Sequence, residues 1–486
     1  MKHFKFFIII LSLLVASCKN EKTNDIASEI NAIENGLLPL IQVKGDPLQG
    51  FNLLERMEHY KVPGVSLAIV ENGIIKWAKG YGIANTESGS AVDTSTIFQA
   101  GSISKPVAAL SALKLVEEGK IDLDQDVNSY LKDWKIPENK FTQEEKVTLR
   151  RLLTHTAGMT VHGFPGYKQT DTFPSITQVL DGEGNTPKIF VDIIPGSIWR
   201  YSGGGYIVIQ KMVEDITGLQ FDVYIKSNIL QHIDMENSTY EQPLRAESYS
   251  NISAAYDGNG KIIEGLWHNY SEKAAAGLWT TPSDLAKYCI EIQEILKGKV
   301  NGVLSKETVE KTVTKHKNAW GLGPSLQWEQ DSLIFRHGGK NAGFSNELVA
   351  FAMHGNAVII MTNADNGGRL INELLRSVSN YYNWGISRQK VVESIILPIE
   401  SLKSFIGKYK LDFQVPEIGD YEVDITIKDN NLFVTDPNNG ETNVLIALEN
   451  SKFVDLESGA EVMFQLMGDK QGLLWDNKFH FYRIGE

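Results

Sequence analysis

Two residues that can carry out acyl transfer together stand three positions apart in the segment from Phe98 to Pro106. Ser102 offers a hydroxyl, which is a poor nucleophile until a base removes its proton, and Lys105 can be that base when it is desolvated and neutral. If the segment is helical, this spacing places both side chains on one face, about one turn apart. The same spacing also suits a serine that caps a helix and a solvated lysine, so other segments must decide between the two interpretations.

The segment after Lys105 is apolar from Val107 to Val116, interrupted only by Ser111 and Lys114. A helix that is apolar on nearly all sides is a buried one. Pro106 fits such a helix only in its first turn, where the backbone amides have no helical acceptor. The run therefore predicts a dry environment, which is what lowers the pKa of a lysine.

Two further segments offer groups that a reactive serine needs. Tyr201 lies on a glycine-rich turn that opens a predicted helix, and a phenol near an ammonium can lose its proton below its usual pKa. At the end of a predicted strand, His337 is followed by two glycines, which let a substrate approach the backbone, and then by Lys340, whose amide can point into a site. Taken singly, each segment also fits an ordinary packing tyrosine or a strand-ending turn.

Other kinds of site find little support in the sequence. The ten histidines include no His-Glu-x-x-His pattern, the two cysteines form no cluster, and no serine lies in a Gly-x-Ser-x-Gly context. We therefore expect no metal and no organic cofactor. The formal net charge of −13, without a long basic cluster, makes nucleic acid an unfavourable partner.

Together, the three segments resemble the motifs of the serine β-lactamase and penicillin-binding protein superfamily, in their order and approximate spacing. The resemblance is greatest to the class C-like branch, which includes D-stereospecific peptidases and carboxylesterases, and it covers about residues 48–385. Supporting stretches are Pro63-Gly64-Val65-Ser66, Gly80-Tyr81-Gly82, Leu152-Leu153-Thr154-His155-Thr156-Ala157-Gly158 and Ala276-Gly277-Leu278.

The resemblance implies a role for each motif residue. Ser102 would be the acylated nucleophile, and Lys105 and Tyr201 would handle its proton. The backbone amides of Ser102 and Lys340 would form the oxyanion hole. His155 lies in a motif that is structural in this family, and we leave it out of the catalytic set. The residues that would line the substrate are His337, Gly338, Gly339 and Gly203.

Two departures from the family pattern bear on the substrate. The second motif commonly ends in an asparagine that binds the substrate's amide, and here Gly203 has no side chain. The third motif begins with a lysine in true β-lactamases, and here it begins with His337. We therefore expect a serine hydrolase for an ester or a peptide-like amide, including substrates with a D-residue. A β-lactamase, a DD-peptidase and a non-catalytic sensor of cell-wall fragments remain alternatives.

The N-terminus resembles a lipoprotein signal peptide over residues 1–18. A basic start is followed by an apolar run from Phe6 to Val15, which is too short to span a bilayer, and Ala16-Ser17-Cys18 ends it like a bacterial lipobox. We expect Cys18 to be lipidated, so that the protein is anchored outside the cytoplasm to a bacterial membrane. Cys289, in a helical context, is expected to be a buried packing residue.

Beyond the signal, the chain divides into four parts. Residues 19–47 are expected to form a tether and a lead-in helix. Strands near both ends of 48–385, with helices between them, predict one antiparallel sheet beside a helical subdomain, an α/β (α+β) domain. Residues 386–398 are predicted to be a linker. Short alternating strands in 399–486 predict a small all-β barrel or sandwich, and this segment resembles the lipocalin-like barrel that some members of the superfamily carry. Its role, whether in walling the site, binding a hydrophobic ligand or oligomerisation, stays open, as does the oligomeric state.

Overall fold

The computed structural model describes residues 25–484, except 49, 250, 416–418, 438–439 and 469. Contacts divide the chain into two compact units, one of Leu54–Ile371 and the other of the described parts of Met1–Leu53 and Asn372–Glu486. The predicted signal peptide with Cys18 lies outside the described residues, as does the start of the predicted tether. Within the described part of the chain, no helix is long and apolar enough to cross a membrane.

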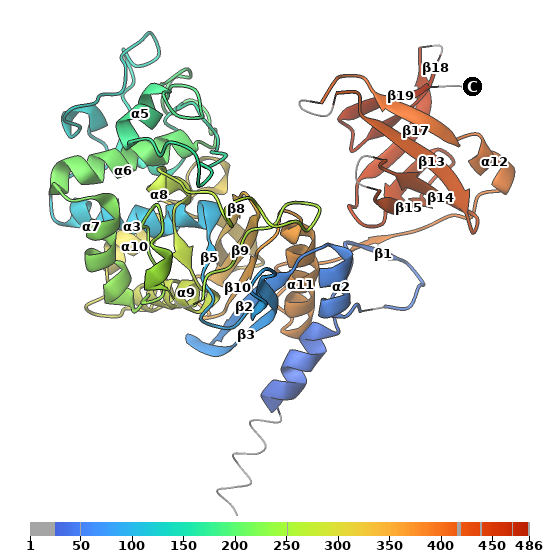
Figure 1. Cartoon of the computed structure of the whole chain (residues 1–486), viewed down its shortest axis with the longest axis horizontal. Coiled ribbons are helices and arrows are strands. Elements are labelled where there is room, and N and C mark those ends of the chain that lie inside the picture. The colour runs from blue at the N-terminus through green and yellow to red at the C-terminus, as the bar shows by residue number, and fades with distance from the viewer. Residues whose placement is uncertain are drawn as a thin grey trace, which may run out of the picture. The chain divides into compact units, whose positions relative to one another are not determined.

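A seven-stranded antiparallel sheet forms the framework of the first unit (Figure 1). Three adjacent strands come from the start of the unit and the other four from its end, which confirms the predicted sheet built from distant segments. In order across the sheet the strands are β4 (Ser90–Ala91), β3 (Ile74–Asn85), β2 (Gly64–Glu71), β10 (Ala357–Thr362), β9 (Phe344–Phe351), β8 (Ser332–Asn341) and β7 (Ser325–Glu329).

The turn between β2 and β3 shows why the sequence predicted a hairpin. Glu71 pairs with Ile74, so only Asn72 and Gly73 lie between the strands. Both have positive φ angles, 55° and 77°. A two-residue turn of this kind matches the twist of its flanking strands, and asparagine followed by glycine adopts it with the least strain.

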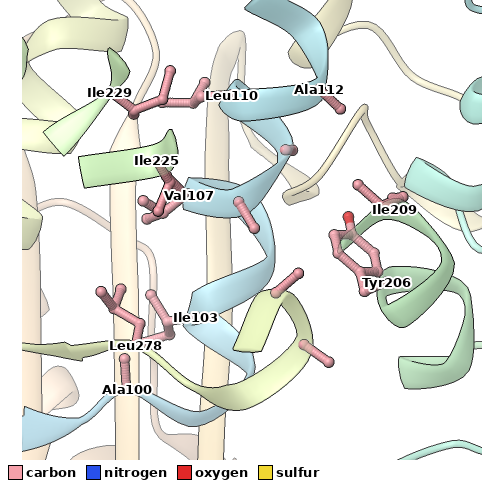
Figure 2. Packing of buried hydrophobic residues seen from close by; sticks show 14 of the residues in the cluster. Ala100, Ile103, Val107, Leu110, Ala112, Tyr206, Ile209, Ile225, Ile229 and Leu278 are labelled. Carbon is pink, nitrogen blue, oxygen red and sulfur yellow. The ribbon is translucent and has the colours of Figure 1, made fainter. Parts of the chain in front are cut away.

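The helical part of the first unit is arranged around the predicted buried helix. This helix, α3, spans Ser104–Glu117, and Pro106 falls in its first turn, as expected. Figure 2 shows Val107 and Leu110 of α3 beside Ile225 and Ile229 at α7, with α6 on another side. The other α-helices of this unit are α2 (Leu53–His59), α4 (Leu149–Leu153), α5 (Ile176–Asp181), α6 (Gly203–Thr217), α7 (Phe221–Asn228), α8 (Lys273–Ala276), α9 (Pro282–Leu296), α10 (Lys306–Thr312) and the start of α11 (Gly367–Tyr381). Cys289 on α9 is fully buried and its thiol is free, as expected for a packing residue.

In the second unit, eight strands close into the predicted barrel (Figure 1). An eight-stranded barrel is just wide enough for side chains to fill it, and Tyr409, Phe453, Phe464 and Leu473 are buried in its core. The described barrel therefore has a packed apolar interior. Its strands are β12 (Gly407–Leu411), β13 (Glu422–Lys428), β14 (Asn431–Thr435), β15 (Thr442–Ala447), β16 (Lys452–Asp455), β17 (Glu461–Met467), β18 (Lys470–Trp475) and β19 (Phe479–Ile484).

Segments from both chain ends meet in this second unit. A helix covers residues 25–34, in the region where a lead-in helix was expected. The strand β1 (Ile41–Val43) pairs in parallel with β11 (Lys390–Val392), which lies within the predicted linker of residues 386–398. Ile41 and Val392 pack against Val454 of β16. Part of the predicted linker is therefore ordered by pairing with a segment some 350 residues earlier in the chain.

Candidate active site

Ser102 and Lys105 are hydrogen-bonded to each other at the start of α3. Ser102 lies in a 3₁₀ turn, η1 (Gly101–Ile103), immediately before the helix. The Nζ atom of Lys105 lies 2.9 Å from Ser102 Oγ and 2.8 Å from the carbonyl oxygen of Ala275 on α8. Only 2% of Lys105 is exposed, and burial lowers its pKa to about 7. A large fraction of the amine is therefore neutral near pH 7, as a base for the serine must be.

The turn that carries Ser102 is fixed by backbone contacts on both sides. The strand β5 (Phe98–Gln99) pairs with β6 (Trp279–Thr280), and the amide of Ala100 donates to the carbonyl of Leu278 at 2.8 Å. On the helix side, Ser104 Oγ accepts the amide of Leu278 at 3.0 Å. The second serine of the motif thus holds the turn in place.

Tyr201 approaches the same serine from the start of α6. Its ring centroid lies 5.1 Å from Lys105 Nζ, and its hydroxyl is close enough to Ser102 for that residue to lower its pKa. Burial raises the pKa of Tyr201 above its ordinary value, and the interaction with Ser102 offsets only part of this rise. The expected lowering of this pKa by a nearby ammonium is wrong here, because the burial of Tyr201 itself raises the pKa. Tyr201 is therefore a protonated phenol near neutral pH.

The third motif lies on β8, against the turn that carries Ser102. A Cβ atom on Gly339 would lie 1.9 Å from the carbonyl oxygen of Ala100, and one on Gly101, which has a φ of +54°, would lie 2.5 Å from the amide nitrogen of Lys340. Both positions therefore require glycine. This close approach brings the Lys340 amide to the Ser102 turn, where the two amides of an oxyanion hole are expected.

The edge of β8 beyond this contact is accessible to a substrate. The strand β7 pairs with β8 only as far as Arg336, so the motif residues that follow have no partner from β7. Gly338 is exposed there. The side chain of Lys340 is directed to Asp365, with Nζ 3.8 Å from Oδ1, so that this residue offers the site its backbone only.

His337 is uncharged and almost completely buried. Its Nδ1 lies 2.6 Å from the carbonyl oxygen of Gly338, and because a carbonyl can only accept, Nδ1 carries the proton. Only 5% of the residue is exposed, and burial lowers its pKa to about 3. The third motif therefore supplies no positive charge near Ser102.

Several aromatic side chains around Tyr201 were not selected from the sequence. The rings of His155, His162 and Trp320 have centroids 4.2, 4.8 and 5.8 Å from that of Tyr201. His155 is buried, its Nδ1 accepts the amide of Ser202 at 3.1 Å, and burial lowers its pKa well below the ordinary value. His162 belongs to the segment 156–198, which is a long loop interrupted by the short helix α5. Trp320 follows α10 and belongs to no recognisable pattern.

A metal centre finds no basis in the described part of the chain. No group of three or more histidine, cysteine, aspartate or glutamate side chains is placed there to hold an ion. The arrangement around Ser102 is instead one for acyl transfer, with a nucleophile, a neutral buried amine, a phenol and two backbone amides.

The curated relatives of this chain include a Protein flp and a teichoic acid D-alanine hydrolase. The chain is 22% identical over 360 residues to Protein flp of Staphylococcus aureus (strain N315), covering 73% of this chain and 68% of that protein. It is 27% identical over 233 residues to the teichoic acid D-alanine hydrolase of Staphylococcus aureus, covering 47% of this chain but only 54% of that enzyme.

Solved structures show the same fold. The octameric penicillin-binding protein homologue from Pyrococcus abyssi matches with a TM-score of 0.61 at 21% identity, covering 89% of this chain and 98% of that one. The D-amino acid amidase from Ochrobactrum anthropi SV3, complexed with L-phenylalanine, matches with a TM-score of 0.56 at 18% identity, covering 73% of this chain and 99% of that one. The Beta-lactamase family model matches residues 52–378. Because this match spans well over half of the sequence and contains the whole site around Ser102, the chain belongs to the beta-lactamase family of serine hydrolases.

Proposed function

We propose that this protein hydrolyses an ester or amide of a D-amino acid through an acyl intermediate on Ser102. The observation that carries the proposal is the 2.9 Å contact between Ser102 Oγ and the buried Nζ of Lys105, whose pKa burial lowers to about 7. A serine with a neutral amine at hydrogen-bond distance has what it needs for activation.

The geometry supports a sequence of proton transfers. Lys105 accepts the proton of Ser102 as Oγ bonds to the substrate's carbonyl carbon, and the amides of Ser102 and Lys340 stabilise the resulting oxyanion. The leaving alcohol or amine takes a proton from Tyr201, which regains one from Lys105. Water then attacks the carbonyl carbon of the acyl-enzyme and gives a proton to Lys105, and Lys105 returns this proton to Ser102 Oγ as the bond between that oxygen and the acyl carbon breaks and the acid product leaves. Each oxyanion donor contributes about 3–4 kcal/mol of transition-state stabilisation.

Two observations favour a D-aminoacyl substrate over a β-lactam. The relatives include a teichoic acid D-alanine hydrolase, and the solved structures include a D-amino acid amidase. In addition, the neutral, buried His337 offers no fixed charge for the carboxylate of a β-lactam or of a peptide terminus. We therefore place β-lactamase and DD-peptidase activity second, and a non-catalytic sensor after them.

The place of action is also a proposal. The basic start, the short apolar run and the Ala16-Ser17-Cys18 ending support lipidation at Cys18 and attachment to a bacterial membrane outside the cytoplasm. In cells fed a radioactive fatty acid, the wild-type protein should become labelled and remain with the membranes. Cys18→Ser should lose both properties, and labelling of this variant would contradict the proposal.

A fluorophosphonate probe tests the assignment of the nucleophile. It should label the wild type and leave Ser102→Ala unlabelled, while Ser88→Ala, at an exposed serine between β3 and β4, should still be labelled. Equal labelling of wild type and Ser102→Ala would reject the acyl-serine mechanism. Turnover of D-alanyl esters, D-aminoacyl amides and a chromogenic cephalosporin then ranks the substrates. Fast cephalosporin hydrolysis would favour the β-lactamase alternative, and ligand binding without any turnover would favour the sensor.

A further inference from the structure

The space next to Gly203 is occupied by another part of the chain. A Cβ atom on Gly203 would lie 2.7 Å from Cε2 of Phe164 and 3.0 Å from the carbonyl oxygen of His162. Both residues belong to the loop 156–198. A side chain at position 203 would therefore collide with this loop. The space that it would fill beside Tyr201 is occupied by residues of the loop.

Three consecutive carbonyl groups fix this loop to the start of α6. Ser202 Oγ donates to the carbonyl of Thr160 at 2.8 Å, the amide of Gly204 to that of Val161 at 3.1 Å, and the amide of Gly203 to that of His162 at 3.0 Å. Val161 has a φ of +62°, which a β-branched residue rarely adopts. A strained backbone conformation of this kind is kept only where the surrounding contacts hold it in place, and such conformations are common at functional sites. The loop therefore holds His162 in a defined position.

His162 differs from the other two histidines near Tyr201. The rings of His155 and His337 have centroids 4.2 and 6.2 Å from that of Tyr201, but both residues are buried. His162, at 4.8 Å, is exposed. Its imidazole can both donate and accept hydrogen bonds. It can therefore reach a bound substrate next to the phenol that contacts Ser102.

We propose that His162 is a substrate-binding residue that hydrogen-bonds the amino group next to the scissile carbonyl of a D-aminoacyl substrate. In this role it replaces the side chain that is missing at Gly203. The inference rests on the proposed function, because it concerns the acyl part of the group transferred to Ser102. It implies that recognition of the amino group depends on the loop 156–198 and not on the second motif itself.

Two esters that differ only in this amino group test the inference. They are the p-nitrophenyl ester of D-alanine and p-nitrophenyl propionate. His162→Phe keeps an aromatic ring beside Tyr201 but has no ring nitrogen. We expect the ratio of kcat/KM for the D-alanine ester to that for the propionate ester to fall about tenfold, the loss typical of one hydrogen bond. His162→Gln, which keeps a donor and an acceptor, should retain most of the ratio, and His232→Ala, at an exposed histidine of another segment, should leave it unchanged.

The outcomes separate this inference from the proposed function. An unchanged ratio in His162→Phe, with fluorophosphonate labelling retained, would overturn the inference and leave the acyl-serine mechanism intact. An equal fall for both esters would also overturn it, since it would show that the ring only supports Tyr201. A wild type that is neither labelled nor active on either ester would overturn both proposals.

Discussion

The interior of the barrel and the surroundings of Ser102 are built from opposite kinds of buried group. In the barrel, Phe464 stacks on Phe405 with centroids 4.4 Å apart, and Phe453 meets it edge-on. Next to Ser102, a lysine and a histidine are as deeply buried as those rings. Burying an amine or an imidazole destabilises the folded state, whereas burying an apolar side chain stabilises it. Protein interiors therefore seldom contain amines or imidazoles unless these groups are paired. The difference marks where selection has favoured chemistry over stability.

Removing the buried amine should give the largest effect on activity. Lys105→Met keeps the length and the apolar stem of the side chain but leaves Ser102 without a base. We expect kcat/KM for an ester to fall about 10⁴-fold. Lys114→Met is the matched control, because it lies on the same helix and its Nζ contacts only the carbonyl of Val303 among the hydrogen bonds described for it. If Lys105→Met kept more than about a tenth of the activity, another group would have to be the base.

Removing a ring from the barrel should affect stability instead. Phe464→Ala leaves a cavity among Phe405, Tyr409 and Phe453, and we expect it to cost about 3–5 kcal/mol in the free energy of unfolding of the barrel. Leu466→Ala, two residues along the same strand, should cost little, because Leu466 is 77% exposed. Urea denaturation followed by circular dichroism gives both values. Equal costs for the two variants would show that the barrel interior is not the packed core described above.

The same contrast explains what the sequence could predict. Alternating apolar residues and the Asn72-Gly73 turn are local sequence patterns. They predicted the strands of the sheet and of the barrel, and the structure contains both. Ser102 and Lys105 are only three residues apart, so their spacing in the sequence was enough to predict that the two side chains lie close together. The carbonyl of Ala275 also contacts Lys105, but every residue has a backbone carbonyl, so the identity of residue 275 could not predict this contact. Trp320 comes from a segment without periodicity, and only the tertiary fold brings it to Tyr201.

The direction of the shift in the pKa of Tyr201 could not be predicted from the sequence either, because it also depends on the tertiary fold. A charged lysine nearby would lower it, whereas burial raises it, and the balance depends on how dry the site is. That dryness is the sum of many packing contacts from distant segments. The predicted roles of Lys105 and Tyr201 could therefore not be separated until the burial of both was known.

The pH dependence of catalysis should show the smallest of these effects and separates the two candidate bases. The neutral form of Lys105 is the active one, so kcat/KM for an ester should fall about tenfold for each pH unit below about 7 and reach a plateau above it. The buried histidines stay neutral in this range, because the pKa of His337 is lowered to about 3 and that of His155 also lies well below its usual value. Tyr201, whose pKa is raised by burial, would instead give a rate that keeps rising through pH 9. A profile from pH 5.5 to 9.5 on the wild type distinguishes the two, and a continued rise above pH 8 would transfer the role of base from the lysine to the phenol.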